Sequence, residues 1–103
     1  MEFRRITEGD MDQVVQFTVE GLRPALYPSL HVSQAKVRAA MIHFMRSESD
    51  FHVAVFDHGR LVGGMAAFVH PSIFFERAEA TIVMLRAVVP GLGRMMLGAF
   101  RAW

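Results

Sequence analysis

The sequence predicts a single α/β domain in which helices pack on one sheet, and three observations carry this prediction. A chain of 103 residues has the length of one domain. The hydrophobic fraction of 52% and the charged fraction of 20% allow a buried core and exclude a disordered tail. The apolar periodicity alternates between helix and strand spacing in the order β-α-α-β-β-β-α, which predicts a mixed α/β layer.

The first half of the chain predicts one short strand and two helices. Apolar and basic residues from Phe3 to Ile6 are typical of a strand. Thr7 and Asp10 have the spacing of a capping box, so a helix is expected over Glu8 to Leu22. A second helix is expected after Ser33, which can serve as its N-cap. The apolar face of this second helix contains Val37, Met41, Phe44 and Met45.

A hairpin is the strongest strand signal. Two β-favouring runs in FHVAVFDHGRLVGGMAAFV flank His58-Gly59, a two-residue turn with glycine in its second position. Gly63 and Gly64 weaken the second run, or they mark a bulge or a close approach of the backbone. A loop opened by Pro71 is then expected over His70 to Arg77.

The end of the sequence predicts a long strand, a tight turn and a helix. The strand is expected over Glu79 to Val89, and its largely apolar composition predicts burial on both faces. A turn over Pro90 to Gly93 leads into a helix expected over Arg94 to Trp103. The residues expected on its inner face are Met95, Met96, Ala99 and Phe100.

Composition excludes several classes of function. A net charge of +1 gives no support for a nucleic-acid or membrane surface. The absence of cysteine excludes disulfides, thiolate catalysis and cysteine-based metal sites. The five histidines form no metal-binding spacing, so no metal is expected. The opening MEFRRITEGD has no apolar signal-peptide core, and no apolar run reaches about 18 residues, so a soluble, cytoplasmic protein is expected.

The stretch VVPGLGRMMLGAF places a Gly-x-Gly where a strand pattern changes to a helix pattern. The unpaired amides and partial positive charge of a helix N-terminus favour an anion, and glycine lets a phosphate approach the backbone. The candidate amide donors run from Gly91 to Met95. Arg94 can add a charge, as can Arg86 if it points to the same side. On the two glycines alone, the favoured interpretation is a tight connection that binds nothing. A dinucleotide-binding fingerprint and a P-loop are both excluded by the spacing.

Three segments in this order resemble the GNAT superfamily of acyl-CoA-dependent N-acetyltransferases. FRRITEGDMDQVVQF is similar to the family's first strand and helix, and FHVAVFDHGRLVGGMAAFV to its second and third strands. EATIVMLRAVVPGLGRMMLGAFRAW is similar to its fourth strand, coenzyme A loop and following helix. Within it, Gly91-Leu92-Gly93-Arg94-x-Met96-Leu97 resembles the family's G-x-G-x-x-L-L run. The resemblance implies one partial GNAT-like domain over residues 1–103.

The resemblance also implies an activity and its residues. Acetyl-CoA would donate an acetyl group to an amine of a small molecule or a protein. Glu79 is the implied candidate for the catalytic base, and Tyr27, His31 and His70 are the candidates for acceptor contacts. The residues implied to hold acetyl-CoA are Val88, Val89, Gly91, Leu92, Gly93, Arg94 and Met95.

The sequence departs from the family pattern in two places. Val88 stands where the family's loop has a polar residue, and the glycines follow Pro90 directly. The family continues into a fifth strand and further elements, whereas this sequence stops at Trp103. The strand over Glu79 to Val89 is therefore expected at a sheet edge, where a second copy or a partner protein would cover it. Besides N-acetyltransfer, a non-catalytic module acting through this edge and a coenzyme A sensor stay open.

Overall fold

The computed structural model describes residues 1–22 and 31–103, and Tyr27 lies outside the described residues. The predicted order of strands and helices is confirmed, with one short 3-10 helix added before the first α-helix. The elements are β1 (Glu2–Arg4), η1 (Glu8–Asp10), α1 (Met11–Leu22), α2 (Gln34–Arg46), β2 (Phe51–Asp57), β3 (Arg60–Pro71), β4 (Ala78–Ala87) and α3 (Leu92–Ala102).

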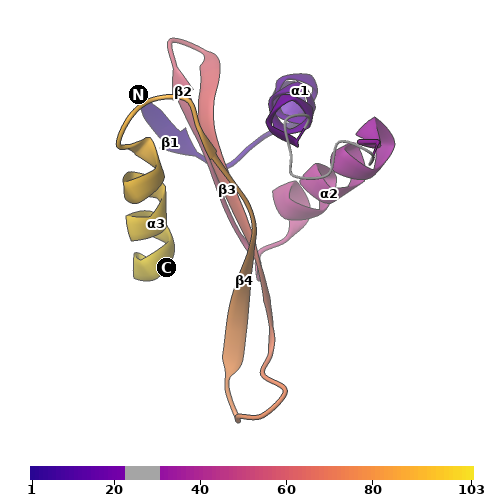
Figure 1. The fold of residues 1–103 in the computed structure, drawn as a ribbon, viewed down its shortest axis with the longest axis vertical. Coiled ribbons are helices and arrows are strands. Elements are labelled where there is room, and N and C mark those ends of the chain that lie inside the picture. The colour runs from indigo at the N-terminus through magenta and orange to yellow at the C-terminus, as the bar shows by residue number, and fades with distance from the viewer. Residues whose placement is uncertain (23–30) are drawn as a thin grey trace.

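The four described strands form one sheet in the order β1-β2-β3-β4, and each neighbouring pair is antiparallel. Helices cover both faces: α1 and α2 lie on one side and α3 on the other (Figure 1). The side chains divide in the same way. Ala54, Phe56 and Ala66 pack with α1 and α2, whereas Val55 and Met65 pack with Leu92 and Met96 of α3. The sheet therefore separates two apolar cores, as alternation along a strand requires.

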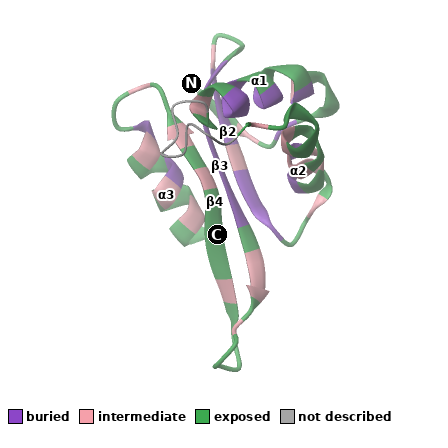
Figure 2. Cartoon of the chain, turned by 45° about the vertical axis from the view of Figure 1, so that its right-hand side comes forward, coloured by how far each residue is buried: buried purple, intermediate pink, exposed green. Residues whose placement is uncertain are grey.

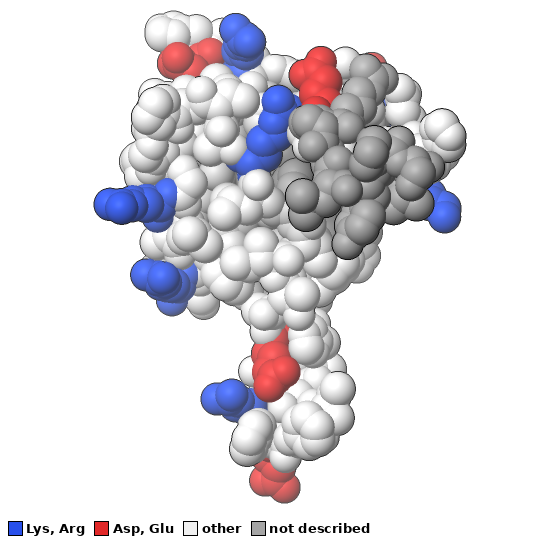
Figure 3. Space-filling model, in the orientation of Figure 1, with Lys and Arg blue, Asp and Glu red and all other residues white. Residues whose placement is uncertain are grey.

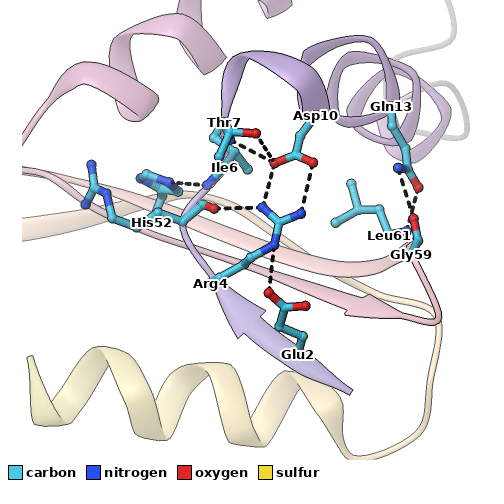
Figure 4. Close-up of polar contacts among 10 residues, drawn as sticks. Glu2, Arg4, Ile6, Thr7, Asp10, Gln13, His52, Gly59 and Leu61 are labelled. Carbon is cyan, nitrogen blue, oxygen red and sulfur yellow. Dashed lines mark hydrogen bonds and ion pairs between the residues drawn. The ribbon is translucent and has the colours of Figure 1, made fainter.

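The capping pair predicted at the start of α1 is confirmed. The Thr7 amide and hydroxyl donate to the Asp10 carboxylate at 2.8 and 2.9 Å. The Arg4 guanidinium donates to both Asp10 oxygens, at 2.6 and 3.0 Å (Figure 4). The bond from Arg4 holds the pKa of the Asp10 carboxyl well below its usual range. This network ties β1 to the first turn of the helical segment.

The predicted two-residue hairpin between β2 and β3 is also confirmed. His58 and Gly59 have positive φ values of 50° and 79°, as a type I′ turn requires. Gln13 of α1 holds the turn from the side (Figure 4). Its Oε1 accepts from the Leu61 amide at 2.6 Å, and its Nε2 donates to the Gly59 carbonyl at 3.4 Å.

The burial expected for the last strand is wrong. The strand β4 is at an edge of the described sheet, and most of its side chains are exposed (Figure 2). The helices cover β2 and β3, and the distal parts of β3 and β4 project beyond them as an arm (Figure 1). The loop expected over His70 to Arg77 is shorter, because β3 continues to Pro71 and β4 begins at Ala78. Coverage of this edge by a second copy or a partner stays a prediction.

The orientation expected for the last helix is partly wrong. Gly91 is its N-cap, so α3 begins at Leu92, two residues earlier than predicted. Leu92 and Met96 are buried against the sheet, whereas Met95 and Ala99 are exposed. The extra residues at the start add Leu92 to the inner face, and Leu92 and Met96 then share one side at i, i+4 spacing.

A buried histidine gives the fold a pH dependence. The Ile6 amide donates to Nε2 of His52 at 3.1 Å, and the His52 side chain is buried. Burial, aided by the charge of Arg5, lowers the pKa of His52 to about 4. An unfolded histidine has a pKa of about 6.5, so between these values the unfolded state binds more protons than the folded state. The free energy of unfolding should therefore fall by about 3 kcal/mol as the pH falls from about 6.5 to 4.

The variant His52→Gln tests this dependence, because a glutamine oxygen can still accept from the Ile6 amide. Urea denaturation across this pH range should show a flatter profile for His52→Gln than for the wild-type chain. The matched control is His31→Gln, since His31 is exposed before α2. Parallel profiles for the wild type and His52→Gln would contradict the assignment.

Candidate active site at the end of β4

The loop between β4 and α3 is anchored at its start and turns at a glycine. The Val88 amide donates to the Val62 carbonyl of β3 at 3.0 Å. Gly91 has a φ of 82°, and a Cβ there would meet nothing within 4 Å. This left-handed conformation disfavours other residues, so the turn itself accounts for Gly91.

The turn does not account for the second glycine. Gly93 does not have a positive φ, and a Cβ there would also meet nothing within 4 Å. Neither the backbone conformation nor packing therefore requires a glycine at this position. A missing side chain does leave the backbone of the first helical turn open to a ligand.

Only some of the predicted amide donors are free in the described residues. The Leu92 amide donates to the Val89 carbonyl at 3.3 Å, and the Met95 amide to the Gly91 carbonyl at 3.4 Å. The expectation that these two amides face a ligand is therefore corrected. Within residues 1–22 and 31–103, no hydrogen bond engages the amides of Gly91, Gly93 and Arg94.

Positive charge accompanies these amides on α3. Arg94 and Arg101 are exposed on this helix, and Figure 3 shows basic side chains on the side of the molecule where α3 lies. Arg86 is directed elsewhere. It donates to the Phe17 carbonyl, and its guanidinium lies 4.2 Å from the centre of the Phe17 ring on the α1 face of the sheet.

A bulge in β4 was missed by the sequence analysis. Ala66 pairs with Met84 and Ala67 with Ile82, so Val83 is an extra residue on β4. The extra residue of a bulge leaves the hydrogen-bond ladder and is often found beside active sites. The run TIVMLRA contains no glycine or proline that would mark this position.

Three hollows follow β4 along the α1 and α2 face. One of about 170 Å³ lies near Val88 and is bordered by Glu20, Arg60 and Arg86. A second, of about 340 Å³, is lined by Glu20, Gly21, Leu22, Val83, Met84, Leu85 and Arg86. A third, of about 290 Å³, lies between α1, α2 and the β4 residues Val83 and Met84. The bulge therefore borders two of the three hollows.

Known structures share this arrangement, although no family model and no curated protein matches the sequence. A possible acetyltransferase from Clostridium difficile 630 superposes with a TM-score of 0.78 at 9% identity, over 98% of this chain and 68% of that one. A ribosomal-protein-alanine N-acetyltransferase from Brucella melitensis gives 0.70 at 16% identity, over 99% and 65%. The PaiA N-acetyltransferase from Thermoplasma acidophilum, in complex with coenzyme A, gives 0.63 at 14% identity, over 98% and 70%.

The chain has the GNAT acetyltransferase fold. The resemblance read from the three sequence segments is thereby confirmed at the level of the fold. Within the described residues, no helix is long and apolar enough to cross a membrane, and no cluster of three metal-ligating side chains occurs.

The GNAT fold places the other predicted residues away from the loop. Glu79 and His70 face each other across β3 and β4 on the arm. A strand rises about 3.3 Å per residue, so Glu79 lies roughly 26 Å from Ala87 at the far end of β4. His70 is bonded through Nε2 to the Thr81 hydroxyl at 2.8 Å, and His31 is exposed before α2. The structure therefore brings Glu79 and His70 together, but not with the glycine loop.

The arm is joined to α2 by a second polar group that the sequence analysis did not identify. The Asp50 carboxylate is buried just before β2. It accepts from the Val69 amide at 2.8 Å and contacts Nε2 of His43 at 2.7 Å. The Val69 amide and then His43 lower the pKa of the Asp50 carboxyl. These bonds hold the base of the arm against the C-terminal end of α2.

Proposed function

We propose that this chain binds acetyl-CoA and transfers its acetyl group to an amine. The observation that carries the proposal is the glycine loop at the N-terminus of α3, with amides at Gly91, Gly93 and Arg94 that no described residue engages. A pyrophosphate is the anion that such a loop suits, because several amides and the helix dipole favour negative charge at one point. A structural neighbour that contains coenzyme A supports the choice of ligand.

Acetyl-CoA would then lie along the exposed edge of β4. The pyrophosphate would meet the three amides and the Arg94 guanidinium, and the rest of the molecule would pass Val89 and Val88 toward the bulge. From Val88 to Val83 the backbone covers roughly 17 Å at about 3.3 Å per residue. The thioester would then lie at the bulge, beside the hollows between β4 and the first two helices.

The chemical step needs little from the protein besides positioning and charge stabilisation. Acetyl-CoA supplies a thioester, whose C–S bond breaks as the amine nitrogen forms a new C–N bond. The acceptor ammonium first loses one proton to a base or to water, and its second proton passes to the departing sulfur, which gives an amide and a thiol. The Val83 amide would donate to the carbonyl oxygen as negative charge develops there.

A calorimetric titration of the purified chain with acetyl-CoA tests the proposal. Saturable binding, followed by formation of free thiol when an amine is added, is the expected result. No binding at millimolar acetyl-CoA would contradict the proposal, and the glycines would then only turn the chain. If acetyl-CoA bound but no added amine caused thiol release, the function would be that of a coenzyme A sensor.

The role of Glu79 is a separate prediction. Its place on the arm, far from the loop, predicts that Glu79→Gln leaves the affinity for acetyl-CoA unchanged. Four strand residues at about 3.3 Å each separate Glu79 from Val83, so as the proposed base it would act through a chain of waters. On this proposal kcat should fall more than about tenfold. The matched control is Glu76→Gln in the neighbouring exposed loop, which should keep both values. An unchanged kcat in Glu79→Gln would remove Glu79 from the mechanism.

A further inference from the structure

The hollow of about 290 Å³ beside the bulge gives information on the acceptor. Its β4 wall is formed by Val83 and Met84, and its other walls come from α1, α2 and Phe68 of β3. We propose that this hollow binds the apolar body of a primary amine, an inference that rests on the proposed function. The acceptor class is then an amine on an aromatic or aliphatic group, and not a polyamine or another polycation.

The lining of this hollow is almost entirely apolar. Eight of its ten described lining residues are Leu22, Val37, Ala40, Met41, Phe44, Phe68, Val83 and Met84. The hydroxyl of Thr18 is already donated to the Val14 carbonyl at 2.9 Å. An apolar group that enters the hollow would be removed from water, which is favourable. No buried polar group would lose a hydrogen-bond partner as a result.

The charge at this hollow is also unsuited to a polycation. Lys36 is the one charged residue among the described lining residues, and its side chain is positive. Each additional ammonium group of a polyamine would meet a like charge there and no carboxylate. A single ammonium directed away from the hollow avoids this repulsion.

A carboxylate lies in the neighbouring hollow, where a single ammonium would be placed. The two hollows share Leu22, Val83 and Met84, and the second adds Glu20. The Oε1 atom of Glu20 accepts from Gln16 at 2.8 Å, and the Glu20 side chain is exposed at the last turn of α1. Arg86 borders the same hollow, but its guanidinium donates to the Phe17 carbonyl. Glu20 is therefore positioned to attract the amine beside the bulge.

The same amine chemistry has two sources, a small arylalkylamine and a peptide with an apolar N-terminal residue. Three probes separate these sources from a polycation: 2-phenylethylamine, the peptide Phe-Gly-Gly and spermidine. Their binding is measured directly on the full chain by NMR titration, first without acetyl-CoA and then at saturating acetyl-CoA. We expect 2-phenylethylamine to bind at least about tenfold more tightly than spermidine, and Phe-Gly-Gly to follow if the source is a peptide.

Two variants of α2 give a matched pair for this measurement. Ala40→Phe fills the hollow and should weaken 2-phenylethylamine binding at least about tenfold. Ala35→Phe makes the same change at an exposed position of α2 and should leave the binding unchanged. If Ala40→Phe does not fold, Lys36→Glu replaces it, since this exposed residue can change without cost to the core and should raise the affinity for spermidine.

Glu20 has its own test. Glu20→Gln should raise the KM for the amine and leave kcat and the affinity for acetyl-CoA unchanged, since its role is to attract the ammonium. Glu48→Gln is the control, because Glu48 is exposed beyond the end of α2.

The outcomes separate this inference from the proposed function. The inference would be overturned if spermidine bound more tightly than 2-phenylethylamine, or if Ala40→Phe and Ala35→Phe weakened 2-phenylethylamine binding equally. Binding of acetyl-CoA would still support the proposed function in that case. If Ala40→Phe weakened 2-phenylethylamine binding but acetyl-CoA did not bind, the proposed function would be overturned. The hollow would then still be a binding site for an amine. Absence of binding by all three amines would also overturn the inference.

Discussion

Replacement of Gly93 by aspartate is expected to weaken acetyl-CoA binding about 100-fold, which corresponds to roughly 2.7 kcal/mol. The new carboxylate would project into the open space beside the first turn of α3, where a pyrophosphate is proposed to bind. It would occupy that space and repel the phosphates. An acidic residue in the first turn of a helix favours the helix dipole, so a loss of binding would not come from a loss of stability. Isothermal titration calorimetry measures the effect.

The control for this variant lies on the same helix. Gly98 is exposed, and a Cβ there would also meet nothing within 4 Å. Gly98→Asp therefore makes the same chemical change more than one turn away from the loop and should leave the affinity close to that of the wild type. Equal losses of acetyl-CoA affinity in the two variants would show a general effect of the added negative charge. An unchanged affinity in Gly93→Asp would show that the glycine loop is not part of the binding site.

Replacement of Leu92 by alanine is expected to lower the free energy of unfolding by about 3 kcal/mol. Leu92 is 1% exposed, and its side chain packs over Gly63 of β3, where an added Cβ would lie 2.7 Å from the Leu92 Cδ2 atom. This contact disfavours a larger residue at position 63, although its partner is the Leu92 side chain and not the backbone segment that the sequence predicts. A cavity at this point would loosen α3 from the sheet, and acetyl-CoA binding should weaken with it.

The matched change is Met95→Ala. Met95 is 53% exposed on the same helix, so the loss of its side chain should alter the free energy of unfolding by about 0.5 kcal/mol or less. Urea denaturation measures both variants. A similar loss of stability in both would contradict the orientation of α3, in which Leu92 and Met96 face the sheet and Met95 faces outward.

The elements that the sequence predicted well are those whose signals are local. Thr7 with Asp10 and Ser33 with the Lys36 amide act as caps in the structure as predicted. The pair His58-Gly59 also identifies its turn from the sequence, because a two-residue type I′ turn requires positive φ values at both central residues, and both residues have them. Each of these signals depends on residues within four positions of one another, so tertiary packing did not need to be known.

The features that the sequence did not predict depend on distant partners. An apolar strand is buried only if other elements cover it, and the exposure of β4 follows from its place at the edge of the described sheet. The bulge at Val83 depends on the register between β3 and β4, and no residue in the sequence of β4 indicates this register. Pro71 predicts the start of a loop, but a proline is tolerated on an edge or at the end of a strand, and β3 continues to Pro71.

The candidate site was predicted in part for the same reason. The glycine loop is contiguous in the sequence, so its position at the N-terminus of α3 followed from the change of pattern near Gly91. Which of its amides bond within the turn, as those of Leu92 and Met95 do, depends on the conformation of the turn. The hollows between β4 and the helices are made by residues far apart in the sequence, such as Thr18 and Met84, and no spacing rule joins these.

The arm between β3 and β4 has a consequence for the behaviour of the protein in concentrated solution. Ile73 and Phe74 at its tip are 87% and 86% exposed, and Phe75 next to them is 63% exposed. Three adjacent apolar side chains on a projecting hairpin form a contact point for any passing apolar surface. We expect concentrated samples to lose solubility first through this tip, and we expect Phe74→Asp to delay precipitation, because Phe74 is not part of the core.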